Sequence, residues 1–244
     1  MSDWPLGYGR QVLAEVDSTM AEAARQASSL AGPTWICALR QTAARGRRGR
    51  VWVNPEGNFA ATLLLPTSDL PETRALRSFV AALALYDALA AVSGRVEGLT
   101  LKWPNDVLLT GGKVAGILLE SVGEHLAIGI GVNLAEAPGL SEVEARAVRP
   151  VSVLSTLGVE VAPEAFLEHL AVAYARQEAQ FQTYGFAPIR EAWLARAARL
   201  GEVVTARVGD ASHQGTFETI DAGGRIVLKT ALGREAIAAA DIFF

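Results

Sequence analysis

The residues best suited to chemistry in this sequence form a six-residue run from Arg45 to Arg50. The run contains four arginines, two glycines and no acidic residue, in a chain whose formal net charge is -4 at pH 7. Glycine disfavours a helix and lets the backbone approach a ligand closely, while each guanidinium can bind carboxylate or phosphate oxygens in pairs. We therefore predict a mobile loop that closes on an anion. A solvated surface or a nucleic-acid patch is the alternative that this run alone leaves open.

A second polar cluster begins at Lys102. It reads Lys102-Trp103-Pro104-Asn105-Asp106 and continues with Lys113. The chain has nineteen Arg but only three Lys, so two Lys within twelve residues indicate that a compact ammonium is needed here. Asp106 follows Pro-Asn where a strand breaks, and it is either a turn residue or a carboxylate directed at Mg²⁺. The cluster predicts a second group of charges that acts on anions.

Brought together, the two clusters would place several cations, one carboxylate and an aromatic ring in one site. Neither cluster contains a Ser-His-Asp or Cys-His pairing that would activate a nucleophile. Cations and Mg²⁺ would instead hold a substrate carboxylate and a nucleotide phosphate close to each other. The acyl-phosphate product is quickly lost to water, which gives the arginine loop a reason to close. The clusters therefore favour carboxylate activation by nucleotidyl transfer.

The whole sequence limits the classes of protein to consider. With 244 residues, of which 50% are hydrophobic, it can bury a full core. The single cysteine, Cys37, excludes an intrachain disulfide and fits a reducing cytosol, and no His/Cys cluster has transition-metal spacing. The N-terminus lacks the pattern of a secretory signal, and the longest apolar helix candidate, Phe79 to Val92, is too short to span a bilayer. These features predict a cytoplasmic protein with no membrane partner.

The elements that must position the two clusters are strands and helices in alternation. Several strands are joined by tight turns, so the sheet is expected to be mixed or antiparallel. Ser18 or Thr19 is expected to cap the first helix, with Glu22 completing a capping box. The predicted strands cover 11–16, 34–40, 58–65, 99–103, 107–109, 113–122 and 125–134; the predicted helices cover 19–28, 74–92, 151–157, 163–182 and 189–198; and 135–149 is predicted to be a surface loop.

The pattern changes near Leu200, where apolar and polar residues begin to alternate in short pieces separated by turn residues. Four strands are expected there, at 202–208, 215–220, 225–229 and 235–242, which suits a small SH3-like barrel. We therefore predict an α+β fold. A mixed sheet covered by helices forms a catalytic domain over residues 1–199, and a small SH3-like domain follows over residues 200–244.

Five motifs, in this order and spacing, resemble those of biotin protein ligases. Each is weak alone, but five in order are specific, and the resemblance spans nearly the whole chain. The motifs are Gly46-Arg47-Arg48-Gly49-Arg50 with the preceding Arg45; Trp52; Lys102-Trp103-Pro104-Asn105-Asp106; Lys113-x-x-Gly116-Ile117-Leu118-x-Glu120; and Gly129-x-Gly131-x-Asn133, flanked by Asp17-Ser18-Thr19 and Asp241-Ile242-Phe243-Phe244.

The resemblance implies a catalytic domain similar to class II synthetases and a two-step reaction. Biotin and MgATP give biotinyl-5′-AMP and pyrophosphate, and one lysine of a biotin carboxyl carrier domain then attacks the adenylate. Lys113 and Arg47 are implied as catalytic residues and Asp106 as the metal ligand. The implied biotin contacts are Ser18, Thr19, Gln41, Arg45, Gly46, Arg47, Lys113 and Gly116, and the implied ATP contacts are Arg48, Arg50, Trp52, Lys102, Asn105 and Asn133.

Three positions depart from the family's pattern. Met20 stands where Asn usually follows Ser-Thr, Ala44 stands where Gly is usual, and Asn54 replaces a common Ser before Pro55. None of these changes removes a charged group, so the predicted activity is unaffected. They change one contact to the biotin ureido ring and the way the arginine loop begins. Because only sixteen residues precede Asp17, a helix-turn-helix module and the dual ligase–repressor form are not expected.

Two other interpretations remain. A lipoate or octanoate ligase or transferase shares the fold and the acceptor-lysine chemistry. A nucleic-acid-binding module would instead use the arginine loop, bind with a steep salt dependence and ignore biotin; we predict no nucleic-acid partner. The sequence does not choose between a monomer and a homodimer, nor does it identify the carrier protein.

Overall fold

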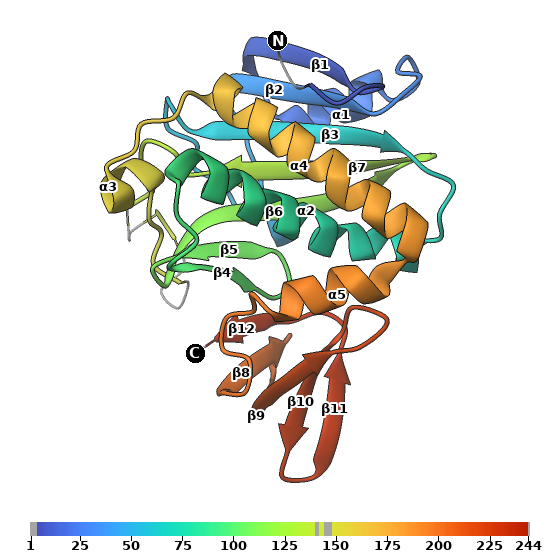
Figure 1. Cartoon of the computed structure of the whole chain (residues 1–244), viewed down its shortest axis with the longest axis vertical. Coiled ribbons are helices and arrows are strands. Elements are labelled where there is room, and N and C mark those ends of the chain that lie inside the picture. Colours follow the sequence, from blue (N-terminus) through green and yellow to red (C-terminus); the bar gives the residue numbers. More distant parts are fainter. Residues whose placement is uncertain (1–3, 140–141, 144–147, 244) are drawn as a thin grey trace.

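A seven-stranded sheet forms the centre of the larger part of the molecule (Figure 1). The computed structural model describes residues 4–139, 142–143 and 148–243, so part of the predicted 135–149 loop lies outside the described residues. The strand order is β1-β2-β3-β7-β6-β5-β4, where β1 and β2 are parallel and the other neighbours are antiparallel. The strands are β1 Gly9–Val16, β2 Thr34–Gln41, β3 Phe59–Pro66, β4 Leu99–Lys102, β5 Asp106–Leu109, β6 Gly112–Val122 and β7 His125–Val132.

Both faces of this sheet carry helices. In Figure 1, α2 (Pro71–Ser93) and α4 (Pro163–Tyr184) lie in front of the sheet, and α1 (Thr19–Gln26) lies behind it. Strand residues alternate between the two sides: Trp35 and Cys37 join the main core under α2 and α4, whereas Ile36 joins a small cluster under α1. Burial on both sides explains why these strands are almost continuously apolar, and the mixed sheet confirms the predicted α+β class.

Helix α2 is the long buried helix of the core. Pro71 is its first residue and Gly94 ends it in the left-handed conformation, with a φ of 66°. Its 23 residues extend beyond the predicted 14-residue apolar candidate, and by length and composition alone it could cross a membrane, so the argument from shortness was wrong. In the fold, 56% of its most apolar window is buried, as expected of a core helix.

Two helices, α3 and α5, differ from their predicted boundaries of 151–157 and 189–198. Short helix α3 is Val153–Leu157, and α5 is Phe186–Leu194 instead of 189–198. Helix α5 stops early because the next residues bond to the edge strand β4: Leu101 N–H donates to Arg196 O and Ala198 N–H donates to Leu101 O. The backbone after Leu194 therefore extends the edge of the sheet instead of continuing the helix.

A second, five-stranded antiparallel sheet follows, in the order β11-β10-β9-β8-β12. Sequence reasoning predicted four strands, but the last one is split, since β11 pairs with β10 and β12 pairs with β8 at the opposite edge. Residues 238–240 connect β11 at one edge of this sheet to β12 at the other edge. The Trp103 indole N–H donates to Gly224 O and ties this sheet to the larger part. Its strands are β8 Val203–Val208, β9 Ala211–Ile220, β10 Ile226–Thr230, β11 Gly233–Ile237 and β12 Asp241–Phe243.

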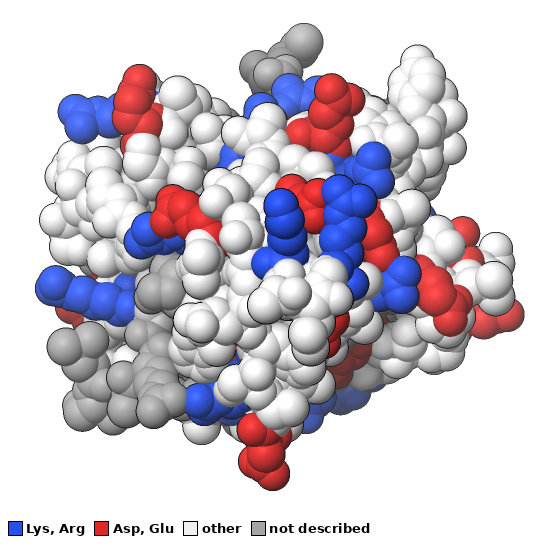
Figure 2. Space-filling model, turned by 90° about the horizontal axis from the view of Figure 1, so that it is seen from below, with Lys and Arg blue, Asp and Glu red and all other residues white. Residues whose placement is uncertain are grey.

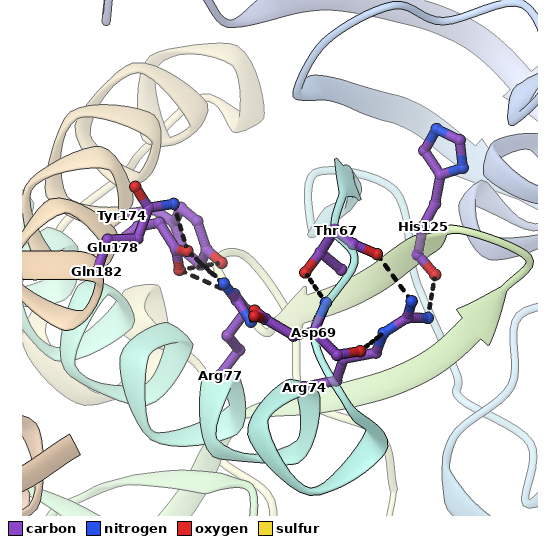
Figure 3. A network of polar contacts seen from close by, with 8 residues as sticks. All are labelled: Thr67, Asp69, Arg74, Arg77, His125, Tyr174, Glu178 and Gln182. Carbon is purple, nitrogen blue, oxygen red and sulfur yellow. Dashed lines mark hydrogen bonds and ion pairs between the residues drawn. The ribbon is translucent and has the colours of Figure 1, made fainter. Parts of the chain in front are cut away.

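A buried ion pair joins α2 to α4 (Figure 3). The Arg77 guanidinium binds both oxygens of Glu178, with its Nη2 2.8 Å from Oε1, and its Nη1 lies 2.7 Å from Asp69. Only 3% of Arg77 and 2% of Glu178 are exposed. Tyr174 and Gln182 also donate to Glu178. Burial alone would lower the pKa of Arg77, but Glu178 raises it above its usual value, so the guanidinium stays charged.

Removing one partner of this pair should destabilise the fold, because the other charge would remain buried without compensation. We expect Arg77→Met to lower the free energy of unfolding by about 3 kcal/mol, measured by urea denaturation followed by circular dichroism. Glu168→Gln is the matched control, since its ion pair with Arg10 is exposed and its loss should change stability by less than about 0.5 kcal/mol. Equal effects of the two substitutions would contradict this assignment.

Candidate functional site

A pocket with a volume of about 540 Å³ opens on the α1 side of the large sheet. Its floor is made of glycines. Ideal Cβ atoms at Gly129 and Gly131 would lie 2.8 Å from the Met20 sulfur and 2.5 Å from the Trp52 ring, so only glycine allows these side chains to rest on β7. Gly116 on β6 has the same role under Trp52, at 3.2 Å. The glycines of β6 and β7 thus form a floor on which Met20 and Trp52 rest beside the pocket.

One wall of the pocket is a hydroxyl and amide cluster at the start of α1. The Gln41 carbonyl accepts from both the backbone N–H and the hydroxyl of Thr19, at 2.8 and 3.2 Å. Thr62 donates to the same hydroxyl. The predicted capping box is absent: Ser18 is the N-cap residue but makes no side-chain cap bond, and Glu22 binds Arg25 and Gln26 instead. The free Ser18 hydroxyl lines the pocket.

The opposite wall is a charged cluster around Asp106. Lys113 Nζ lies 2.7 Å from Asp106 Oδ1, and Lys102 Nζ lies 3.7 Å from Oδ2. Burial alone would raise the pKa of Asp106, but the two ammonium groups outweigh it and lower that pKa. Burial lowers the pKa of Lys102, although Asp106 opposes this. The cluster thus presents excess positive charge to the pocket.

Arg47 brings a third cation to this wall from the arginine loop. Its Nη1 donates to the Asn105 carbonyl at 3.2 Å, and the Asn105 amide donates to Ile117 O at 2.6 Å. Burial lowers the pKa of Arg47 below its usual value, opposed by Asp241. A guanidinium remains protonated even so. Asn105 is therefore a bridge that fixes Arg47 to the sheet.

The arginine loop is a short, hydrogen-bonded hairpin. Arg45 and Val51 form an antiparallel bridge, and Gly46 N–H donates to Arg50 O at 2.7 Å. A single 3-10 turn over Arg47–Gly49 closes it, which agrees with the expectation that the two glycines disfavour a longer helix. Arg48 departs from helical geometry with a φ of 57°, a strained conformation for a residue with a side chain. Ala44 does not prevent the hairpin, because its carbonyl accepts from Trp52 N–H.

The remaining loop arginines bind acids on other elements. Arg45 lies 3.3 Å from Glu120 on β6. Arg48 and Arg50 lie 2.5 and 3.1 Å from the same oxygen, Oδ2, of Asp241 on β12. Burial would raise the pKa of Asp241, but Arg50 and Arg48 lower it. Sequence reasoning placed Asp241 in a closing motif but gave it no part in the site; its position between two apolar runs was the available signal.

Two predicted adenine neighbours also lie in the pocket. The Trp52 indole lies against the glycine floor, and the centre of its ring is 5.6 Å from Lys113 Nζ; its buried N–H has no hydrogen-bond partner among the residues that the structure describes. The Asn133 amide donates to Val151 O at 3.1 Å and so ties β7 to the segment before α3. Of all predicted site residues, Arg48 alone does not line the pocket, because its side chain is turned toward Asp241.

Metal binding can be judged from the donor atoms present. Among the described residues, no group of three or more His, Cys, Asp or Glu is placed to hold a metal ion. Asp106 could contribute one carboxylate, and Oδ2 is its less tightly engaged oxygen. Mg²⁺ in nucleotide sites is typically held by one or two carboxylates together with substrate phosphates. The residues therefore fit a Mg²⁺ ion that arrives with a nucleotide, and not a resident metal.

Two family models match the chain. The biotin/lipoate A/B protein ligase family matches residues 12–133, and the biotin protein ligase C-terminal domain matches residues 200–244. The biotin–[acetyl-CoA-carboxylase] ligase of Paracoccus denitrificans is 56% identical over 238 residues, covering 96% of this chain and 99% of its own. The bifunctional ligase/repressor BirA of Bacillus subtilis is 31% identical, but the matched region covers 65% of its length.

Solved structures agree with this match. The biotin protein ligase of Aquifex aeolicus, solved in complex with biotin and ATP, superimposes with a TM-score of 0.84 at 26% identity, covering 96% of this chain and 97% of that one. Its fold includes the counterpart of the small antiparallel sheet. The sequence match to the Paracoccus ligase extends over nearly the whole of both chains. This chain therefore belongs to the biotin/lipoate A/B protein ligase family and, within it, to the biotin protein ligases.

Proposed function

We propose that this protein activates biotin with ATP and transfers it to a lysine of a biotin carboxyl carrier domain. The observation that carries the proposal is one pocket with two unlike walls. The Ser18–Thr19–Gln41 wall offers neutral hydrogen-bonding groups, and the Lys113–Asp106–Lys102 wall offers cations. A neutral ureido ring suits the first wall, and the carboxylate and phosphates suit the second.

In the first step, a biotin carboxylate oxygen attacks the α-phosphorus of ATP, and pyrophosphate leaves. Both reactants are anions, so their repulsion must be reduced before the bond can form. We assign this role to Lys113 and Arg47, whose charges face the same end of the pocket. Lys102, Arg48 and Arg50 would hold the phosphates, while Trp52 and Asn133 would flank the adenine.

In the second step, the ε-amine of the carrier lysine attacks the acyl carbon, and AMP leaves. The adenylate must survive until the carrier arrives, which requires that water be kept out. The arginine hairpin is suited to this, because its bridge places Arg45, Gly46 and Arg47 along the rim of the pocket. The carrier is proposed to belong to acetyl-CoA carboxylase, as the name of the Paracoccus relative states for that protein.

Mg²⁺ would be held by Asp106 together with the nucleotide phosphates, and it would reduce their negative charge. No nucleic-acid partner is proposed. On the face drawn in Figure 2, lysine and arginine side chains are interspersed with acidic ones and form no continuous basic surface. A cytoplasmic location and a monomer or homodimer remain predictions; sedimentation velocity would determine the association state.

The choice between biotin and lipoate as substrate is tested by supplying each acid separately. The protein is incubated with radiolabelled ATP and either biotin or lipoate, and acyl-adenylate is separated by chromatography. We expect adenylate with biotin only. Adenylate formed with lipoate alone would establish the lipoate ligase alternative, and failure to bind biotin at micromolar concentration in calorimetry would rule out the proposed function.

Lys113→Ala should slow pyrophosphate release by at least about 100-fold, because a preorganised charge beside the reacting oxygens would be lost. The rate is measured with a coupled phosphate assay after pyrophosphatase. Lys229→Ala is the matched control, since Lys229 is the third lysine of the chain and is exposed on β10. A near-normal rate in Lys113→Ala, with the control unchanged, would refute the role assigned to Lys113.

Arg47→Gly should release biotinyl-adenylate into solution, because the loop would lose its attachment to Asn105 and one cation beside the acyl phosphate. We expect about a tenfold rise in free adenylate, corresponding to the loss of one charge-assisted hydrogen bond. Free adenylate is measured by chemical biotinylation of an unrelated, lysine-rich protein added to the reaction. The exposed Arg95→Gly serves as the control, and equal labelling by both variants would disprove this assignment.

A further inference from the structure

The contact between the arginine hairpin and β12 has the form of a phosphate site occupied by a carboxylate. Two guanidiniums, from Arg48 and Arg50, converge on one oxygen of Asp241, at 2.5 and 3.1 Å. They come from the large part of the molecule, and the carboxylate comes from the small sheet. Convergence of several guanidiniums on one oxyanion is how arginines bind a phosphate group.

We propose that Asp241 is a positioning residue that competes with the nucleotide phosphates for Arg48 and Arg50 and holds the hairpin closed when pyrophosphate has left. This inference rests on the proposed ligase function. The carboxylate and a phosphate cannot occupy the same face of both guanidiniums, so binding of one displaces the other. Asp241 would therefore exchange places with the phosphates twice in each reaction cycle.

The geometry of Arg48 indicates that its contact with Asp241 is exchanged during the reaction and is not permanent. Its φ of 57° is unfavourable for a residue with a side chain and persists where surrounding contacts hold it. Its side chain binds Asp241, which lines the pocket, while Arg48 itself is not among the pocket-lining residues. Release of Asp241 would let Arg48 relax and swing toward a phosphate.

Asp241 also connects this exchange to the pocket itself. Its neighbours Ile242 and Phe243 line the pocket together with the hairpin residues Arg47 and Arg50. Re-formation of the ion pairs after pyrophosphate leaves would therefore draw β12 and the hairpin together over the adenylate. The side chains are about half exposed on the arginine side, 46% and 42%, so the pairs are weak enough to be exchanged.

The alternative is that Asp241 merely fixes the small sheet in place. The two cases differ in their response to a phosphate probe. Inorganic pyrophosphate is titrated by calorimetry, at constant ionic strength, into the wild-type protein and into the variants D241N, D241E and E120Q. Glu120→Gln is the matched control because Glu120 on β6 pairs with Arg45 of the same hairpin, so this substitution removes an equal charge beside the same loop.

If Asp241 competes with phosphate, D241N should bind pyrophosphate about fivefold more tightly than the wild type, because its weak, half-exposed ion pairs with Arg48 and Arg50 would no longer compete. D241E and E120Q should remain within twofold of the wild type. Unchanged or weaker binding by D241N, an equal gain in E120Q, or no pyrophosphate binding by any of the proteins would overturn the proposal. Loss of cooperative thermal unfolding in D241N would assign Asp241 to the stability of the sheet and overturn it as well.

A second measurement uses the reaction. With biotin and ATP, D241N should show a lower KM for ATP and a larger fraction of biotinyl-adenylate lost to solution, and D241E should restore both values. If Asp241 had only a structural role, D241N would lower kcat without lowering the KM for ATP or increasing the loss of adenylate. If the wild-type protein makes no adenylate, the proposed ligase function fails, while the pyrophosphate titration still decides whether Asp241 competes for the hairpin.

Discussion

The charge balance around Asp106 is the constraint on which the pocket depends. Lys102 and Lys113 both contact this single carboxylate, and Lys102 is nearly buried. Two unscreened like charges 4 Å apart would repel by about 4 kcal/mol near a protein surface, so such cations stay together only around a counter-charge. Asp106 supplies it, and one acid for two lysines leaves net positive charge to attract anions. The site therefore carries net positive charge before an anion binds.

The sheet determines where that charge lies. Asp106 begins β5, opposite Lys102 on β4 and Gly116 on β6, and the register shift between Val107 and Leu108 brings Lys113 of β6 back toward it. On the same face, the glycine floor of β6 and β7 keeps the adjoining space open for a ligand. A side chain at any of these glycines would fill the space or displace Trp52 or Met20. The register of the strands and the glycines of β6 and β7 therefore together create a pocket with one neutral and one charged wall.

The parts that could be predicted from the sequence are those determined by local pattern. Apolar runs located the strands, Pro71 and Pro163 located helix starts, and the glycine–arginine run located the hairpin. What could not be predicted depends on pairing between distant segments. Helix α5 ends early because the residues after it bond to Leu101, and the last strand is split because β12 joins β8. Ser18 makes no side-chain cap bond and lines the pocket instead. The role of Asp241 could not be predicted for the same reason, since its partners lie nearly two hundred residues away in the sequence.

The hairpin's own contacts explain how a closed loop can still open. Its four arginines are held at three separate places: Arg45 by β6, Arg47 by Asn105 after β4, and Arg48 with Arg50 by β12. The ion pairs are half exposed, so each is weak and is further screened by salt. Their sum, together with one backbone bridge, is enough to define a single conformation. Because these contacts go to separate elements, phosphates could displace Asp241 while the contacts of Arg45 and Arg47 remain. A loop fastened by several weak charges can exchange them for those of the ligand, and this gives an arginine-rich hairpin an advantage over an apolar lid for covering an acyl phosphate.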